Sequence, residues 1–423
     1  MAFSIKAAQR QATMARHPRH DRNLKINNTM AITTINAIET GLTLHAYLAE
    51  KIQRANYTLT EVMHKVLTRY EGAETVFAVS LENMDTFNKY AAPKATLMNM
   101  PFLALLPTLP NPRDWETFVD GVMYSPTVEH LASKMPAVEG MIGRDIFHYN
   151  CMYVTLLKDV LHMNILAAPL LGITFELAEY LMKRPMRQLE SAIGQIKFLL
   201  FRWRFVDSLF WTEYCTGWLS NESVAHYLMS TAQIQASTLP YKASWSNLRL
   251  ERAERDGFAR VLMSQGCRAS TAVDFFNLNR TTARTIYKQI HGVSSPVGCR
   301  TKSLTWYVQS AINRVQATFV VWLYRCALRN DANIPEALIA TNDIAAKLFG
   351  DDLMITADRV NHLTGAMAMD SRLSMAPCRT CKTDYVLANE QGKIELAKDF
   401  VCPGCSYSVK SRLASKKRKK AKS

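Results

Sequence analysis

The stretch CRTCKTDYVLANEQGKIELAKDFVCPGC, residues 378–405, decides the fold of the C-terminal part of the chain. It holds two C-x-x-C pairs, Cys378 with Cys381 and Cys402 with Cys405. Each pair places two thiolates on one tight turn, and zinc takes four such soft ligands in a tetrahedron. Because cysteine fills all four positions, the pattern predicts one Zn²⁺ with a structural role. An iron–sulfur cluster and a pair of redox C-x-x-C motifs are the alternatives.

The residues between the two pairs favour a small β element. DYVLANEQGKIEL, residues 384–396, alternates in a way that predicts a short hairpin turning at Gly392. Together with the cysteines this is a zinc-ribbon-like arrangement, to which a structural zinc can contribute ~10 kcal/mol of folding free energy.

A basic tail, residues 410–423, follows the cysteines and contains no acidic residue. Its eight positive charges supply more than half of the net charge of +15. They lie at Lys410, Arg412, Lys416, Lys417, Arg418, Lys419, Lys420 and Lys422. Cations of this kind release counterions from phosphates, so the tail indicates a nucleic-acid partner. A tail that only aids solubility is the alternative.

The composition is that of a folded soluble protein, with 48% hydrophobic and 21% charged residues. The first residues are basic and polar, and the most apolar window, 156–181, is interrupted by charges such as Lys158 and Asp159. We therefore expect a cytoplasmic protein with no membrane partner. The remaining cysteines are scattered singly, unlike a disulfide framework. They are Cys151, Cys215, Cys267, Cys299 and Cys326.

Apolar residues recur at helical spacing along most of the chain, so the predicted fold class is mainly α. We expect helical domains with helix-turn-helix-like hairpins, joined to the small cysteine module. The predicted divisions are an N-terminal helical region with a basic arm (1–140), a helical domain (141–222), a linker (223–246), a second helical domain (247–370), the cysteine module (371–409) and the tail (410–423).

Two stretches are expected to lack regular structure. Prolines crowd residues 91–115, which predicts irregular structure or a boundary. The polar stretch SNESVAHYLMSTAQIQASTLPYKASWSN, residues 220–247, is interpreted as containing the linker between the two halves.

Residues 266–292, GCRASTAVDFFNLNRTTARTIYKQIHG, predict a helix-turn-helix. Ser270 can cap a short helix that ends at Phe276, and residues 277–279 supply the turn. A second helix is predicted for residues 280–290, with a buried face formed by Ala283, Ile286 and Tyr287. The residues predicted to face outward toward a DNA groove are Arg280, Thr281, Arg284 and Lys288. Any helical hairpin can produce this pattern.

Taken in order, these motifs make residues 245–420 resemble FlhC, the zinc-binding subunit of the bacterial flagellar master regulator. The matching pieces are the hairpin RTTARTIYKQIHG, the loop SSPVG, the helical stretch SAINRVQATFVVWLYRCAL, the stretch TADRVNHLTGAMAMDSRL, the paired cysteines and the basic end. Residues 145–205 are similar to FlhD, its partner subunit, through Leu171-Gly172-Ile173 and the closing sequence FRWRF at 201–205.

This resemblance implies a DNA-binding transcriptional activator. In the family both subunits bind a long promoter site on double-stranded DNA and recruit RNA polymerase, at flagellar genes or at the transfer genes of conjugative elements. The FlhD-like segment implies a homo-oligomer. The chain departs from the family in carrying both segments at once, in its longer cysteine loop, and in residues 1–140, which have no counterpart.

Two other functions are compatible with parts of the sequence. Basic zinc ribbons also bind RNA, so an RNA-binding or ribosome-associated protein is the alternative. An enzyme acting on nucleic acid would need clustered acids for divalent metal, and Asp351-Asp352 is better explained as a helix cap. The sequence holds no Walker loop, G-x-S-x-G or H-E-x-x-H motif. We therefore expect no catalytic residue and no enzyme activity.

Overall fold

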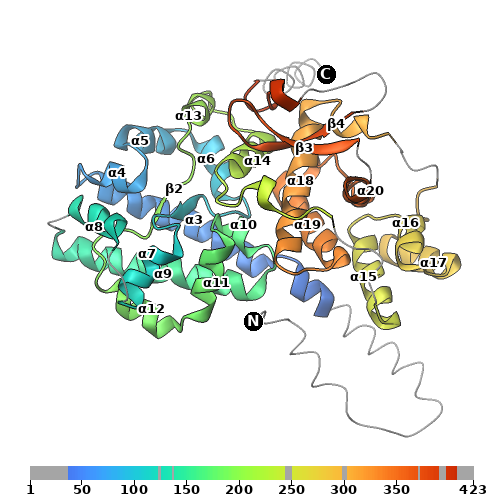
Figure 1. Ribbon diagram of the computed structural model, residues 1–423, viewed down its shortest axis with the longest axis horizontal. Helices are drawn as coiled ribbons and strands as arrows, with labels where there is room; N and C mark the ends of the chain where they lie inside the picture. The colour runs from blue at the N-terminus through green and yellow to red at the C-terminus, as the bar shows by residue number, and fades with distance from the viewer. Residues whose placement is uncertain are drawn as a thin grey trace, which may run out of the picture.

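A computed structural model describes residues 37–121, 125–135, 138–242, 250–297, 303–369, 372–389 and 397–406. Within these residues the fold is mainly helical, which confirms the predicted class (Figure 1). The predicted basic arm in the first thirty residues and the basic tail lie outside the described residues.

The N-terminal part is built on the long helix α3 (Ala46–Leu67), whose apolar stripe is buried from Leu48 to Leu67. Three shorter helices pack against it: α4 (Ala73–Phe77), α5 (Leu81–Lys89) and α6 (Ala91–Met98). The helices α7 (Pro112–Val119) and α8 (Pro126–Ser133) follow in the chain. Asn56 on α3 is fully buried because its amide donates to Met98 O and Phe102 O and accepts from Ala104 N.

The proline-rich stretch 91–115 does not lack regular structure, so that prediction is wrong. It contains α6, the start of α7 and the strand β1 (Leu105–Pro107), and residues 100–109 are buried throughout. β1 pairs antiparallel with β2 (Phe201–Trp203), with Leu106 opposite Arg202. The prolines do not prevent this because β1 is only three residues long and, among the described residues, pairs with β2 alone.

Residues 140–214 form a run of helices around α9 (Gly140–Met163), which packs against α3. The others are α10 (Ala167–Leu171), α11 (Phe175–Lys183), α12 (Met186–Ile193) and α13 (Ser208–Tyr214). Gly172 ends α10 with φ +66°, and a Cβ there would lie 2.5 Å from Leu106 Cδ2. The FRWRF sequence supplies the strand β2.

The residues predicted to form a linker, 223–246, begin inside a buried helix, α14 (Asn221–Ser230), followed by the turn η2 (Ala236–Thr238). Every side chain from Glu222 to Met229 is buried. The linker interpretation is therefore wrong for this part of the chain. The polar sequence suggested an exposed linker, but its polar side chains between Glu222 and Met229 are buried with hydrogen-bond partners. For example, Glu222 Oε1 accepts from Gln316 Nε2 at 3.1 Å.

Helix α18 (Ala311–Arg329) is the central element, preceded by the turn η4 (Thr305–Tyr307). All its residues from Asn313 to Ala327 are buried, as expected for a helix enclosed on all sides. It contacts α10, α14, α19 (Ile334–Phe349) and α20 (Ala357–Met369). The turn η5 (Gly350–Asp352) links the last two. The helices around α9 and those around α18 therefore share one hydrophobic core.

Helices α15 (Arg252–Ser264), α16 (Ala269–Phe276) and α17 (Arg280–His291) pack on one another at the right edge of Figure 1.

The cysteine module contributes the antiparallel strands β3 (Leu373–Pro377) and β4 (Asp384–Ala388) and the turn η6 (Ala397–Asp399). β4 contacts α18, and Val386 N donates to Thr318 Oγ1 at 3.2 Å. β4, which was predicted to be the first strand of a hairpin turning at Gly392, thus pairs with the upstream β3. Residues 390–396, which include the predicted turn, lie outside the described residues.

Candidate metal centre and nucleic-acid interface

The first cysteine pair sits on a tight turn directly after β3. Cys378 N donates to Thr383 O and Lys382 N donates to Cys378 O, each at 2.9 Å. Lys382 takes a left-handed conformation with φ +63°, which turns the chain back toward β4. Arg379 N donates to Phe400 O at 2.8 Å, so the turn is fastened to the segment that leads into the second pair.

Three of the predicted cysteine ligands converge with a histidine that the sequence did not indicate. The ligand atoms of His226, Cys381, Cys402 and Cys405 all lie within 4.8 Å of one another. The Sγ atoms of Cys381 and Cys402 are 3.7 Å apart. A tetrahedral site with Zn–S bonds of about 2.3 Å has an S–S separation of about 3.8 Å, so the residues fit a bound metal ion.

Cys378 lies beside this group and is fully buried. Its Sγ accepts a hydrogen bond from Cys402 N at 3.2 Å, and Cys402 Sγ in turn accepts from Cys405 N at 3.4 Å. Backbone N–H groups that point at sulfur stabilise thiolates. All four predicted cysteines are thus close enough together to serve a metal ion.

The thiols of the cluster have pKa values that are shifted in opposite directions. The hydrogen bond from Cys402 is the main cause that lowers the pKa of Cys381 to about 4. Donating that bond, together with burial, raises the pKa of Cys402. Burial raises the pKa of Cys405 to about 12. A metal ion would displace the remaining protons, since thiolate is the form that binds.

His226 reaches the cluster from α14. Its ring is buried, and Nδ1 lies 2.8 Å from the hydroxyl of Tyr385, a fully buried residue of β4. Burial lowers the pKa of His226, so the imidazole is neutral, which is the form that binds metals. No sequence signal could have found it, because histidine has no spacing relation to cysteines so far away in the chain.

The two helices predicted for residues 266–292 are present and are joined by a short turn, with one correction. α16 begins at Ala269 after Arg268, whose own side chain makes no capping bond, and Ala269 N donates to Ser295 Oγ at 3.1 Å, so Ser270 is not the cap. Asn277 forms the turn with φ +51°, and Asn279 Oδ1 accepts from Thr281 N at 2.9 Å at the start of α17. The loop SSPVG follows α17, and its described residues, 294–297, have no regular structure.

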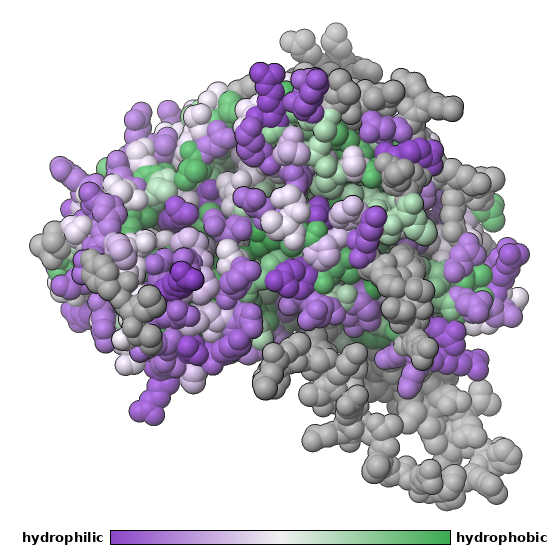
Figure 2. All heavy atoms as spheres, in the orientation of Figure 1, coloured by the Kyte–Doolittle hydropathy of each residue, from purple (hydrophilic) through white to green (hydrophobic). Residues whose placement is uncertain are grey.

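The faces of α17 are those predicted. Ala283, Ile286 and Tyr287 are buried against α15 and α16. The side chains of the predicted DNA-contacting residues are exposed: Arg280, Thr281, Arg284 and Lys288. Figure 2 shows hydrophilic side chains gathered at the right-hand edge of the molecule, where α15 and α17 lie in Figure 1.

This three-helix unit is fastened to the body of the molecule at one end. Arg268 Nε lies 2.8 Å from Asp358 Oδ2, and Arg268 N donates to Asp358 Oδ1 at 3.0 Å. Asp358 belongs to the first turn of α20, so the hairpin is held beside the helix that leads into the cysteine module. The predicted contacts of the tail, Lys410, Arg412 and residues 416–420, lie outside the described residues.

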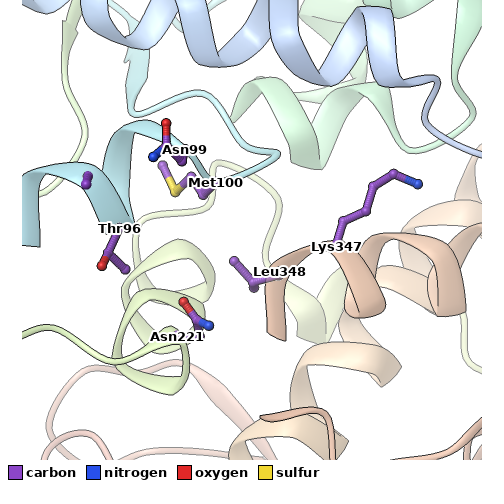
Figure 3. A pocket seen from close by; sticks show the side chains of 7 residues that line it. Thr96, Asn99, Met100, Asn221, Lys347 and Leu348 are labelled. Atoms are coloured by element: carbon purple, nitrogen blue, oxygen red, sulfur yellow. The ribbon is translucent and has the colours of Figure 1, made fainter. Parts of the chain in front are cut away.

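A shallow pocket of about 340 Å³ lies between α6, α14 and α19 (Figure 3). Its lining includes Asn99, Asn221 and one titratable side chain, Lys347, whose ammonium is paired with Asp343. This set offers no paired acid and base, so we assign no catalytic role to it.

No protein-family model and no curated protein sequence matches this chain. Within the described part of the chain, no helix combines the length and the apolar composition that a membrane crossing requires.

Proposed function

We propose that this chain is a zinc-containing transcriptional activator of the FlhD/FlhC type that binds double-stranded promoter DNA and recruits RNA polymerase. The observation that carries the proposal is the exposed basic face of α17. Arg280, Arg284 and Lys288 project from a helix whose other face is locked into a three-helix unit. This is the arrangement with which a recognition helix enters a major groove.

The metal in this proposal is zinc, and its role is structural. Sulfur-rich, tetrahedral sites favour zinc, and the separation of Cys381 and Cys402 suits Zn–S bonds. The ion would hold the module that ends in the basic tail. The tail would add sequence-independent affinity for phosphates, because eight charges follow within residues 410–423.

The DNA proposal is tested by electrophoretic retardation with duplexes selected from a random library. The wild-type chain is expected to bind at low salt, and the logarithm of its affinity should fall linearly with the logarithm of salt concentration. Arg280→Ala and Arg284→Ala should each weaken DNA binding. Replacing an arginine that neutralises a phosphate should also reduce the magnitude of the slope of log affinity against log salt concentration by about 1. Gln289→Ala, an exposed neutral change on the same helix, is the control.

Failure of the wild-type chain to retard any duplex DNA at low salt would remove this proposal. Equal or tighter binding to RNA would instead favour the RNA-binding alternative.

The homo-oligomer implied by the resemblance would use α9, on which Met141 and Phe147 are exposed. Sedimentation of the purified chain tests that part separately.

A further inference from the structure

We infer that His226 is a direct ligand of the bound metal, together with Cys381, Cys402 and Cys405. Cys378 then shapes the site as a positioning residue and does not bind the ion itself. The inference rests on the metal site of the proposed function and changes its ligand set. It also changes what the metal does, since His226 belongs to α14 in the body of the molecule.

The first support is the mutual distance of the four atoms. All lie within 4.8 Å of one another. In a tetrahedral zinc site the S–S edges are about 3.8 Å and the N–S edges about 3.5 Å. Each atom would therefore need to move by only about an ångström or less to reach bonding distance. Cys378 does not belong to this group of four.

The second support is the orientation of the imidazole. Nδ1 of His226 lies 2.8 Å from the Tyr385 hydroxyl, which fixes the ring and leaves Nε2 as the nitrogen that can coordinate. A ligating histidine usually engages its other ring nitrogen with such a partner, which sets the tautomer and the ring plane. Tyr385 is fully buried on β4, between the two cysteine pairs in sequence.

The third support is the close approach of the ring to the second cysteine turn. A Cβ placed on Gly404 would lie 2.3 Å from Cδ2 and 2.6 Å from Nε2 of His226. The space that any side chain at 404 would need is thus occupied by the edge of the ring that bears Nε2. The C-P-G-C turn and the histidine are fitted to each other, with glycine at the position where the ring approaches the backbone.

Cys378 has a different part in this arrangement. Its sulfur accepts a hydrogen bond from the backbone N–H of Cys402, so it orients the backbone of the second cysteine turn. Its burial is complete. A sulfur in this position stabilises the geometry of Cys402 without completing the coordination shell, as outer partners of metal ligands do.

The test is X-ray absorption spectroscopy of the full chain loaded with one equivalent of Zn²⁺. We expect a first shell of sulfur and nitrogen in a ratio of three to one, with the outer scattering that imidazole produces. Co²⁺ in place of Zn²⁺ should give the visible spectrum of a mixed sulfur and nitrogen site. The wild-type measurement stands alone, so the inference can be tested even if a variant fails to fold.

Variants sharpen the result. His226→Asn should remove the imidazole scattering and weaken Zn²⁺ binding by about tenfold or more. His291→Asn is the matched control, because that ring bonds Met263 O at the far edge of the molecule, and it should leave the metal spectrum unchanged. Cys378→Ser should still bind one equivalent of metal with the same shell.

A four-sulfur shell in the wild-type chain would overturn the inference, as would loss of the metal in Cys378→Ser with an unchanged spectrum in His226→Asn. A chain that binds no metal overturns both this inference and the zinc of the proposed function. DNA retardation measured on the same samples separates the two proposals. A mixed shell in a chain that binds no DNA would support the inference and remove the proposed activator function.

Discussion

Arg204 is a fully buried cation that holds three parts of the chain together. Its guanidinium donates to Leu103 O at 3.1 Å, to Leu228 O at 3.0 Å and to Thr231 Oγ1 at 3.1 Å. These partners belong to the segment before β1 and to α14 and its C-terminal end. Burial lowers the pKa of Arg204 to about 9, so the group is still charged at neutral pH.

We predict that Arg204→Met lowers the free energy of unfolding by ~2–4 kcal/mol. The methionine fills much of the space, but the carbonyls of Leu103 and Leu228 lose their donor inside the core, at ~1–3 kcal/mol for each unpaired group. Urea denaturation followed by circular dichroism measures the change. Arg187→Ala, at an exposed position of α12, is the control and should change stability little. A variant as stable as wild type would show that the buried hydrogen bonds contribute nothing net.

Single residues also show where sequence patterns were sufficient. The C-x-x-C pairs predicted a cluster of cysteines that could bind a metal ion, because the spacing within each pair is local. The 3.6-residue period of α17 correctly separated Ala283 and Ile286 from Arg284. His226 could not be predicted, because it reaches Cys381 only through the packing of α14 against the module. Neighbours that are brought together by tertiary packing leave no trace in local spacing.

Helices and strands were predicted well where buried segments have apolar sequences, and poorly where buried segments have polar or proline-rich sequences. The apolar α18 was expected to be a helix, and it is a buried one. α14 has a polar sequence, yet Ser223 donates to Glu213 at 2.6 Å and Tyr227 donates to the same carboxylate at 3.1 Å. Polar groups paired in this way can be buried at little cost. The segment around β1 was misinterpreted for a related reason, since prolines interrupt regular structure without exposing the chain.

The C-terminal end of α7 is joined to α11 and α12 by one carboxylate. Asp120 accepts from Arg184 Nη2 at 2.7 Å, from Tyr180 OH at 2.9 Å and from Gln188 Nε2 at 3.0 Å. The bond with Arg184 is the main cause that lowers the pKa of Asp120 below its usual value. The charged carboxylate is therefore stabilised more in the folded chain than in the unfolded one.

We predict that Asp120→Asn costs ~2 kcal/mol of stability at neutral pH, because it removes charge-assisted hydrogen bonds. The sign of the pH dependence follows from the lowered pKa. The contribution of Asp120 is fully present above its unfolded pKa of about 3.9 and is lost as pH falls through the lower folded pKa. The stability gap between wild type and variant, measured by urea denaturation, should therefore narrow below about pH 4. A gap that is constant across this range would contradict the assignment.

At the scale of the whole molecule, the metal centre and the core are continuous. Helix α14 lies against α18 and sends His226 into the cysteine cluster, while β4 lies on α18 and sends Tyr385 toward the same point. The helices around α9 and the helices and strands around α18 are thus joined by shared packing. A metal ion bound here would stabilise more than the small module that carries the cysteines.

We therefore predict that chelating the metal loosens α14 as well as the module. Hydrogen–deuterium exchange with mass spectrometry should show faster exchange in residues 378–389 and also in residues 221–230, because the helix loses a ligand bond and its packing against Gly404. Helix α11, which does not take part in the metal cluster, serves as the internal reference. Restoring Zn²⁺ should restore protection in both segments together, since binding energy at such a site is folding energy. Faster exchange confined to the cysteine module would mean that the metal stabilises only its own turns, and that α14 is held by α18 alone.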